Sequence, residues 1–318
     1  MTWSIFLLIL IVIAIAIVLL VIYCKFSADH ERSIHEILYP SRYSTRFHES
    51  MFICKNDSYD CRVKNGYYMM SKHRVNIIGL AYNIGNKVEK LLRRCQRLLE
   101  PWQSGSKVVI YCYDSTDNTF PYLKEKQAEY PWLVLPEVVL ENKKNMTRLV
   151  RMANLRNLCL QYLNDNTDYT LIMDFDLSGP LSIDGLANSL SYMDLYEKDS
   201  YDVVCANGML SVVGLNMYLP FFGWNYYDPF AVKLLDGTKV TNSPFRNMIM
   251  KRGDQPFEVI SGFGGAALYK TKVLQKYHYI PDEDECEHVI LHQQMHDDGH
   301  KIAINPSLIV LAGVQGGS

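Results

Sequence analysis

The segment Leu171-Ile172-Met173-Asp174-Phe175-Asp176 places two carboxylates, one residue apart, directly after an apolar run typical of a buried strand. Ligand sites of parallel sheets lie at the carboxyl ends of strands, and hard divalent cations take oxygen ligands. We therefore expect Asp174 and Asp176 to hold Mn²⁺ or Mg²⁺, which would neutralise a diphosphate. The alternative is that the two acids only cap a strand and a turn.

A second polar cluster, residues 113–119, follows another strand-like run. Asp114 could accept a hydrogen bond from the N–H of a base, and Ser115 could bind a ribose or a phosphate. The alternative is an Asx turn in which Asp117 caps the following helix, and both interpretations can hold at once.

Arginines precede the acidic pair, on an expected helix over residues 146–163. Arg148 and Arg151 share a face at a spacing of three, from which guanidinium groups could clamp phosphates. The alternative is an ordinary solvated helix face.

An acidic and histidine-rich segment begins at residue 282. His288 and His292 have the spacing of a helical metal pair, and His296 and His300 continue it. We expect at least one of Glu285, Glu287 and His288 to be catalytic or to bind metal. The alternative is a solvated acidic helix start, which the helix dipole favours.

Small and aromatic residues suggest where a sugar could lie. Gly264 and Gly265 allow close approach to the backbone, although a bulge would also use them. Residues 218–230 read as an aromatic loop in which Trp224 and Tyr227 could stack on sugar faces, although such loops also form packing clusters.

From residue 75 onward, short β-branched runs alternate with amphipathic stretches, which predicts a mostly parallel sheet flanked by helices. The alternation loosens after Asp176. We expect strands at Val75–Leu80, Lys107–Tyr113, Leu133–Leu140, Tyr169–Phe175, Asp202–Ala206 and Lys301–Leu311, and helices near Lys87–Leu99, Tyr122–Tyr130, Met146–Leu163 and Glu285–Asp298.

The N-terminal run Ile5–Cys24 lacks charge, proline and glycine over 20 residues, which is long enough to span a bilayer as a helix. We predict an uncleaved single-pass transmembrane anchor (residues 1–24), a stem (25–73) and a folded domain (74–318) that folds without them. Lys25 and Arg32 follow the span, which favours a cytosolic C-terminal part.

Composition excludes other classes of protein. Charged residues make up 21% and apolar residues 48% of the 318 residues, which argues against wholesale disorder. The net charge of -2 provides no cationic field, so we expect no nucleic-acid partner. The eight cysteines lack the paired spacing of a zinc module; Cys54 and Cys61 could form a disulfide or remain two free thiols.

Together these motifs resemble the GT-A glycosyltransferases, over residues 75–312. The layout is similar to the fungal capsule-type mannosyltransferase-like group. The matching segments are Asp174-Phe175-Asp176, Phe263-Gly264-Gly265-Ala266, Glu285-Cys286 and Ile304-Asn305-Pro306.

The resemblance implies a Rossmann-like GT-A domain that transfers a hexose from a nucleotide-sugar to a hydroxyl of a glycan or glycoprotein, in a Golgi- or ER-type lumenal orientation. It also implies donor contacts at Ala81 and Asp114 and an arginine-asparagine pair at Arg156 and Asn157. The family's acidic pair followed by leucine is replaced here by Glu285-Cys286-Glu287-His288, so either acid could be the base of an inverting reaction.

Two other classes remain open at this stage. Asp174-Phe175-Asp176-Leu177-Ser178 also matches the first motif of haloacid-dehalogenase phosphatases, in which Asp174 would be the nucleophile. A membrane-tethered carbohydrate-binding protein without catalytic activity is the third possibility.

Overall fold

The computed structural model describes residues 6–20, 58–137, 145–163, 166–177, 179–194, 200–216, 219–240, 250 and 252–315. Residues 6–20 form an N-terminal helix whose apolar side chains are exposed, as Leu8 illustrates at 62%. Within the described ranges, no helix is both long and apolar enough to cross a membrane. The predicted transmembrane helix is therefore not confirmed, and its flanking residues 1–5 and 21–24 lie outside the described ranges.

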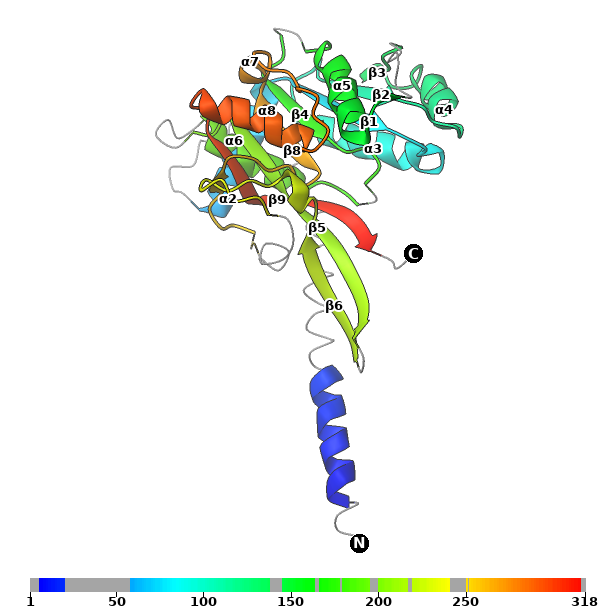
Figure 1. Ribbon diagram of the computed structural model, residues 1–318, viewed down its shortest axis with the longest axis vertical. Helices are drawn as coiled ribbons and strands as arrows, with labels where there is room; N and C mark the ends of the chain where they lie inside the picture. The colour runs from blue at the N-terminus through cyan, green and yellow to red at the C-terminus, as the bar shows by residue number, and fades with distance from the viewer. Residues whose placement is uncertain are drawn as a thin grey trace.

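A nine-stranded mixed sheet organises the described part of the domain, in the order β3-β2-β1-β4-β8-β5-β9-β7, with β6 paired to β5 (Figure 1). The strands are β1 (Val75–Ala81), β2 (Lys107–Cys112), β3 (Leu133–Val134), β4 (Tyr169–Met173), β5 (Val203–Asn216), β6 (Leu219–Tyr226), β7 (Phe257–Val259), β8 (Ala266–Lys270) and β9 (Ile302–Gln315). The helices are α2 (Tyr59–Lys72), α3 (Val88–Leu99), α4 (Thr119–Lys126), α5 (Arg148–Leu160), α6 (Ile183–Asp194), α7 (Thr271–Leu274) and α8 (Glu287–Asp297).

Helices cover both faces of this sheet, because its central strands carry apolar residues without interruption. Every residue of β1 is buried: Ile77 packs in a core with residues of α2, α3, α4 and α6, whereas Ile78 packs with α5 on the opposite face. Residues of α8 join the core formed around β5, β8 and β9. The α/β class with flanking helices is thus confirmed.

The predicted mostly parallel sheet is only half right. Strands β3, β2, β1 and β4 are parallel, as the alternation indicated. Beyond β4 the sheet is mixed, because β8 runs antiparallel to both β4 and β5 and β7 runs antiparallel to β9. The segment 218–230, expected to be a loop, contains β6, which forms an antiparallel ribbon with β5. Its aromatic residues have high strand propensity, which explains the difference.

Helix α2 lies in the range that the sequence assigned to the stem. It begins at the N-cap Ser58, whose side chain accepts a hydrogen bond from the Cys61 N–H, and it packs against α6. Gly66 allows the close crossing, since a Cβ there would lie 1.7 Å from the Ala187 carbonyl oxygen. Cys61 is buried in α2, whereas Cys54 lies outside the described residues, so their pairing stays a prediction.

A chain that begins at Arg74 should be much less stable than one that begins at Ser58. It would lose the burial of Val63, Tyr67 and Met70, which are at most 2% exposed. At about 1.5–3 kcal/mol for each large apolar side chain, the loss is comparable to the stability of an ordinary domain. Thermal unfolding followed by circular dichroism would measure the difference, and equal melting temperatures would show that α2 is dispensable.

Candidate active site

The acidic pair lies at the carboxyl end of β4. The Asp174 side chain is 21% exposed, and Asp176 is exposed. The Asp174 N–H donates to the carbonyl oxygen of Gly265 at 3.0 Å, which fixes the strand end against the start of β8. Phe175, which stands between the two acids in the chain, is 3% exposed and anchors the segment in the core.

Gly264 and Gly265 form the turn that meets this strand end. Both have left-handed backbones, with φ of +61° and +86°, and a Cβ on Gly264 would lie 2.2 Å from the Ala206 carbonyl oxygen. A Cβ on Gly265 would approach the Tyr227 ring to 3.4 Å. The two glycines therefore allow the backbone to lie close to Asp174. The binding of a sugar at this turn stays a prediction.

Arg156 is the central cation of the site. It is 5% exposed on α5, where its Nη2 donates to Asp174 Oδ1 at 3.1 Å and its Nε donates to Glu287 Oε1 at 3.0 Å. Its guanidinium carbon lies 5.2 Å from the ring centre of Phe263. Arg156 thus joins β4 to the start of α8, and its Nη1 is buried without a hydrogen-bond partner in the described part of the chain.

Burial and the charges around Arg156 change the pKa of the neighbouring carboxyl groups. Burial raises the pKa of Asp174 to about 6, an effect that Arg156 opposes and Asp176 reinforces. Burial, with the negative charges of Asp174 and Glu287, raises the pKa of Asp228 to about 8. The site therefore brings together several carboxyl groups around Arg156, and burial makes two of them, Asp174 and Asp228, weaker acids than usual.

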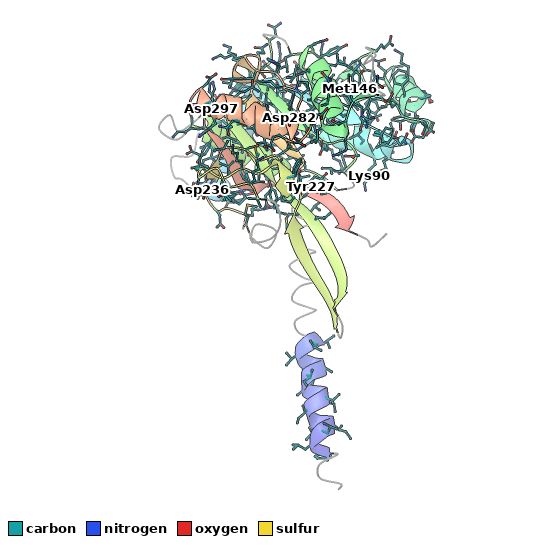
Figure 2. All side chains as sticks on the ribbon, in the orientation of Figure 1. Lys90, Met146, Tyr227, Asp236, Asp282 and Asp297 are labelled. Carbon is teal, nitrogen blue, oxygen red and sulfur yellow. The ribbon has the colours of Figure 1, made fainter. Side chains whose placement is uncertain are left out.

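Asp228 is a site residue that the sequence analysis missed. It directly follows Tyr227 at the foot of the β5–β6 ribbon (Figure 2) and has a left-handed backbone with φ of +63°. Non-glycine residues in this region are strained and cluster at functional sites. The Asp228-Pro229 step was the only local signal, because the proximity to Asp174 arises from the sheet.

The loops that follow β1 and β2 are joined by hydrogen bonds and lie beside the end of β4. Asn83 donates from its backbone N–H to Ser115 Oγ at 3.0 Å and accepts from the Thr116 N–H at 2.8 Å. Tyr82 and Tyr113 stack with ring centres 5.3 Å apart. Tyr82 is 46% exposed, so the pair presents an aromatic surface that the sequence analysis did not foresee.

The residues of these loops that were predicted to bind the nucleotide-sugar differ in exposure. Ala81 is buried at the end of β1, where its carbonyl accepts from the Tyr113 N–H, and Asp114 is exposed with a left-handed backbone. Asp117 accepts from the backbone N–H groups of Gly85 and Thr119, so the turn interpretation is correct for this residue.

Of the predicted residues on α5, Arg148 lies exposed in the first turn, one turn before Arg151. Both polar atoms of the Asn157 side chain bind the backbone of Tyr279. Its Nδ2 donates to the Tyr279 carbonyl at 2.7 Å, and its Oδ1 accepts from the Tyr279 N–H at 2.8 Å. This side chain fixes the segment before α8, and its contact with a nucleotide stays a prediction.

The two candidate bases lie in different surroundings. Glu285 forms an ion pair with Lys239, which is 53% exposed, and also accepts from the Cys286 N–H. Glu287, 8% exposed, forms the buried pair with Arg156. Only Glu287 is joined to the acidic pair through Arg156, whereas Glu285 is engaged at the surface.

His288, predicted as a metal ligand, is 2% exposed and stacks on Phe263 with ring centres 3.7 Å apart. Its Nε2 lies 3.9 Å from Glu287 Oε1 and has no hydrogen-bond partner in the described ranges. Burial lowers its pKa, and Arg156 adds to this effect. Among the described residues, no three histidine, cysteine or acidic side chains form a metal-binding group.

His292 is a core residue rather than a metal ligand. Both ring nitrogens are engaged: Nδ1 lies 3.1 Å from Ser261 Oγ and Nε2 lies 2.8 Å from the Tyr269 hydroxyl. The side chain is fully buried, and burial lowers its pKa to about 3.

The buried His292 should make the protein less stable in acid. As pH falls through the ordinary histidine pKa, His292 takes up a proton in the unfolded chain, whereas in the native state it remains neutral until about pH 3. Between pH 7.5 and pH 5 this histidine should cost about 2 kcal/mol of unfolding free energy. Subtracting the urea-unfolding curves of His292→Gln from those of the parent isolates this contribution, and a pH-independent difference would contradict it.

The donor set at β4 suits a divalent cation. Asp176 is exposed at the strand end, and Asp174 is partly exposed with its Oδ1 bonded to Arg156. Mg²⁺ and similar ions are often bound through only one or two carboxylates together with substrate phosphates, so the absence of a third described protein ligand is compatible with such a site.

No family model matches the chain, and no curated protein sequence matches it. Solved structures with weak similarity include S. aureus TarS in complex with UDP-GlcNAc, at 15% identity and a TM-score of 0.46 over 77% of this chain and 60% of that chain. Another is the mannosyltransferase PcManGT from Pyrobaculum calidifontis with GDP-Man and Mn²⁺, at 15% identity and a TM-score of 0.47 over 80% of this chain and 65% of that chain. A third is GalNAc-T7 with UDP, GalNAc and Mn²⁺, at 12% identity and a TM-score of 0.47 over 77% of this chain and 45% of that chain. The chain spans less than two thirds of each of these chains.

Proposed function

We propose that this protein transfers a hexose from a nucleotide-sugar to an acceptor hydroxyl on a glycan or glycoprotein. The observation that carries the proposal is the position of Asp174 and Asp176 at the carboxyl end of β4, beside the ends of β1 and β2. Nucleotides bind at this edge of open α/β sheets, and a paired carboxylate there suits a diphosphate neutralised by a cation.

Asp174 and Asp176 are the residues that would hold Mn²⁺ or Mg²⁺. When bound, the cation would stabilise the charge of the departing diphosphate. Arg156 holds Asp174 in position from α5, and Gly265 fixes its backbone. This arrangement keeps the carboxylate oriented before substrate arrives, which is the basis of electrostatic preorganisation.

Other residues of the chain would bind the donor. The stacked Tyr82 and Tyr113 rings offer a surface for a base beside the exposed Asp114, which could accept from a base N–H. Arg148 and Arg151 on α5 lie near Tyr113, where their charges oppose the rise in its pKa that burial and Asp176 cause, and their charge suits the diphosphate. Gly264, Gly265 and Tyr227 then line the side on which the sugar and acceptor would meet.

The proposal extends to the membrane. The exposed apolar helix over residues 6–20 supports an N-terminal anchor. The proposed Golgi- or ER-type lumenal orientation of the catalytic domain rests on the resemblance alone, because Lys25 and Arg32 favour the cytosolic side. Trp224 is a candidate acceptor contact by its place in β6 alone, because the structure does not describe its side chain.

The haloacid-dehalogenase alternative gains no support from the site. Its last motif needs acids after a strand, whereas Asp297 and Asp298 lie at the end of α8. There they accept from Gln293 and Tyr277, respectively.

A panel of nucleotide-sugars, assayed with Mn²⁺ for turnover and for slow donor hydrolysis, tests the function. We expect turnover of one donor class, loss of that turnover in EDTA, and a loss of at least about 10²-fold in Asp176→Asn. Asp236→Asn, at an exposed turn, is the matched control. Turnover that survives both EDTA and Asp176→Asn would refute the metal-dependent mechanism. Sugar binding without any turnover would favour the carbohydrate-binding alternative.

A further inference from the structure

The chain has a second uncharged apolar segment, in the β5–β6 ribbon. From Val203 to Tyr227 the sequence contains no charged residue. Within this segment β5 and β6 pair antiparallel from Met209↔Tyr226 to Asn216↔Leu219, and the ribbon projects from the body of the protein (Figure 1). We define the outer ribbon as residues 210–216 and 219–225.

The outermost part of this ribbon is only two strands wide. Strand β9 accompanies β5 as far as the pair Val212↔Gln315, and β8 pairs only with Val203–Cys205. Within the described sheet, residues 213–216 therefore have β6 alone as a neighbour. A two-stranded ribbon is at best marginally stable in water, so its surroundings must contribute to its stability.

Both faces of the outer ribbon are apolar in sequence. Directly opposed residues of an antiparallel pair share a face, and successive residues alternate between faces. A ribbon lying on a protein surface needs only one apolar face. One face has the pairs Val212↔Gly223, Gly214↔Phe221 and Asn216↔Leu219, and the other has Ser211↔Trp224, Val213↔Phe222 and Leu215↔Pro220.

We propose that the outer ribbon inserts into the interfacial region of a phospholipid bilayer. A lipid environment surrounds both faces at once, whereas a protein partner would cover one. Pro220 on β6 disfavours the main alternative, edge-to-edge pairing with a second copy, because proline on an edge strand blocks ladder formation. The exposed apolar helix over residues 6–20 is an independent element that also suits a membrane.

The open backbone edges limit how deep the ribbon can go. Unpaired N–H and C=O groups are not tolerated in the hydrocarbon core, so insertion stops at the headgroup and acyl boundary, about 5–10 Å deep. The inference is independent of the proposed function, although Tyr227 and Asp228 follow β6 directly and would then lie near the membrane surface.

Tryptophan fluorescence of the full chain in phosphatidylcholine vesicles tests the insertion. The four tryptophans are Trp3, Trp102, Trp132 and Trp224, so a Trp3→Phe background removes the reporter near the N-terminal helix. With Trp224→Phe also in this background, the emission gained on adding Leu219→Trp belongs to the outermost pair of the ribbon, Asn216↔Leu219. In vesicles with brominated acyl chains we expect this component to be quenched about twofold or more, because bromine quenches only tryptophans at acyl depth.

Matched charge substitutions separate the possible outcomes. Phe222→Asp should abolish the quenching, because a carboxylate opposes insertion, whereas Leu235→Asp should leave it unchanged since Leu235 is 52% exposed outside the ribbon. Equal melting temperatures would show that both variants are folded. The proposal is overturned if the component added by Leu219→Trp is the same in brominated and plain vesicles. It is also overturned if that component depends on protein concentration instead, which would identify a second copy as the partner.

Discussion

The Arg156→Met variant should lose about 3–5 kcal/mol of unfolding free energy, because removing one partner of a buried ion pair leaves uncompensated charge. Here the guanidinium is 5% exposed and neutralises two carboxylates, Asp174 and Glu287, across the packed interface between α5, β4 and α8. Without it, Glu287 at 8% exposed would keep its charge only at a large desolvation cost.

Urea unfolding at pH 7.5 would measure this loss. Arg148→Met is the matched control, since Arg148 is exposed in the first turn of the same helix and should change stability by no more than about 0.5 kcal/mol. Adding Glu287→Met to Arg156→Met should recover part of the loss by removing the unpaired acid. If Arg156→Met is as stable as Arg148→Met, the carboxylates do not depend on this arginine.

Local patterns predicted the parallel half of the sheet, because those elements bury apolar residues at a regular period. Strand β1 and helix α3 begin and end within one residue of the expected positions. The periodicity failed for α6, which is buried yet rich in polar residues. Its Asn188 Oδ1 and Ser189 Oγ accept hydrogen bonds from Asn305 Nδ2 on β9, each at 2.9 Å, so these two oxygens are satisfied inside the core.

The site shows a similar division. The sequence identified Asp174 and Asp176 from local spacing at a strand end, and the structure places both at that end. It could not distinguish Glu285 from Glu287, because the distinction depends on Arg156, which lies 131 residues before Glu287 in the chain. Asp228 was missed for the same reason, since only the folding of the sheet brings its carboxyl near enough for Asp174 to influence it.

The surroundings of the two glutamates predict very different effects of substitution. Glu287→Gln should lower kcat by about 10² to 10⁴, as expected for loss of a general base or of the charge that orients Arg156 beside Asp174. Glutamine keeps an oxygen that can accept from Arg156 Nε, so the fold should survive. Glu285→Gln should change kcat by less than about twofold, because its partner Lys239 is largely exposed and such pairs contribute little.

Turnover and nucleotide affinity, measured for both variants with Mn²⁺ present, separate these roles. A general base acts after the donor has bound, so Glu287→Gln should lower kcat while donor affinity stays close to that of the parent protein. Asp176→Asn should instead weaken metal-dependent donor binding, because it replaces a charged carboxylate that would hold the cation with a neutral amide. If Glu287→Gln turns over like the parent while Asp176→Asn is inactive, Glu287 serves only as the counter-ion of Arg156. The base would then be sought at Asp228, a carboxyl group near Asp174 to which the proposal assigns no metal-binding role.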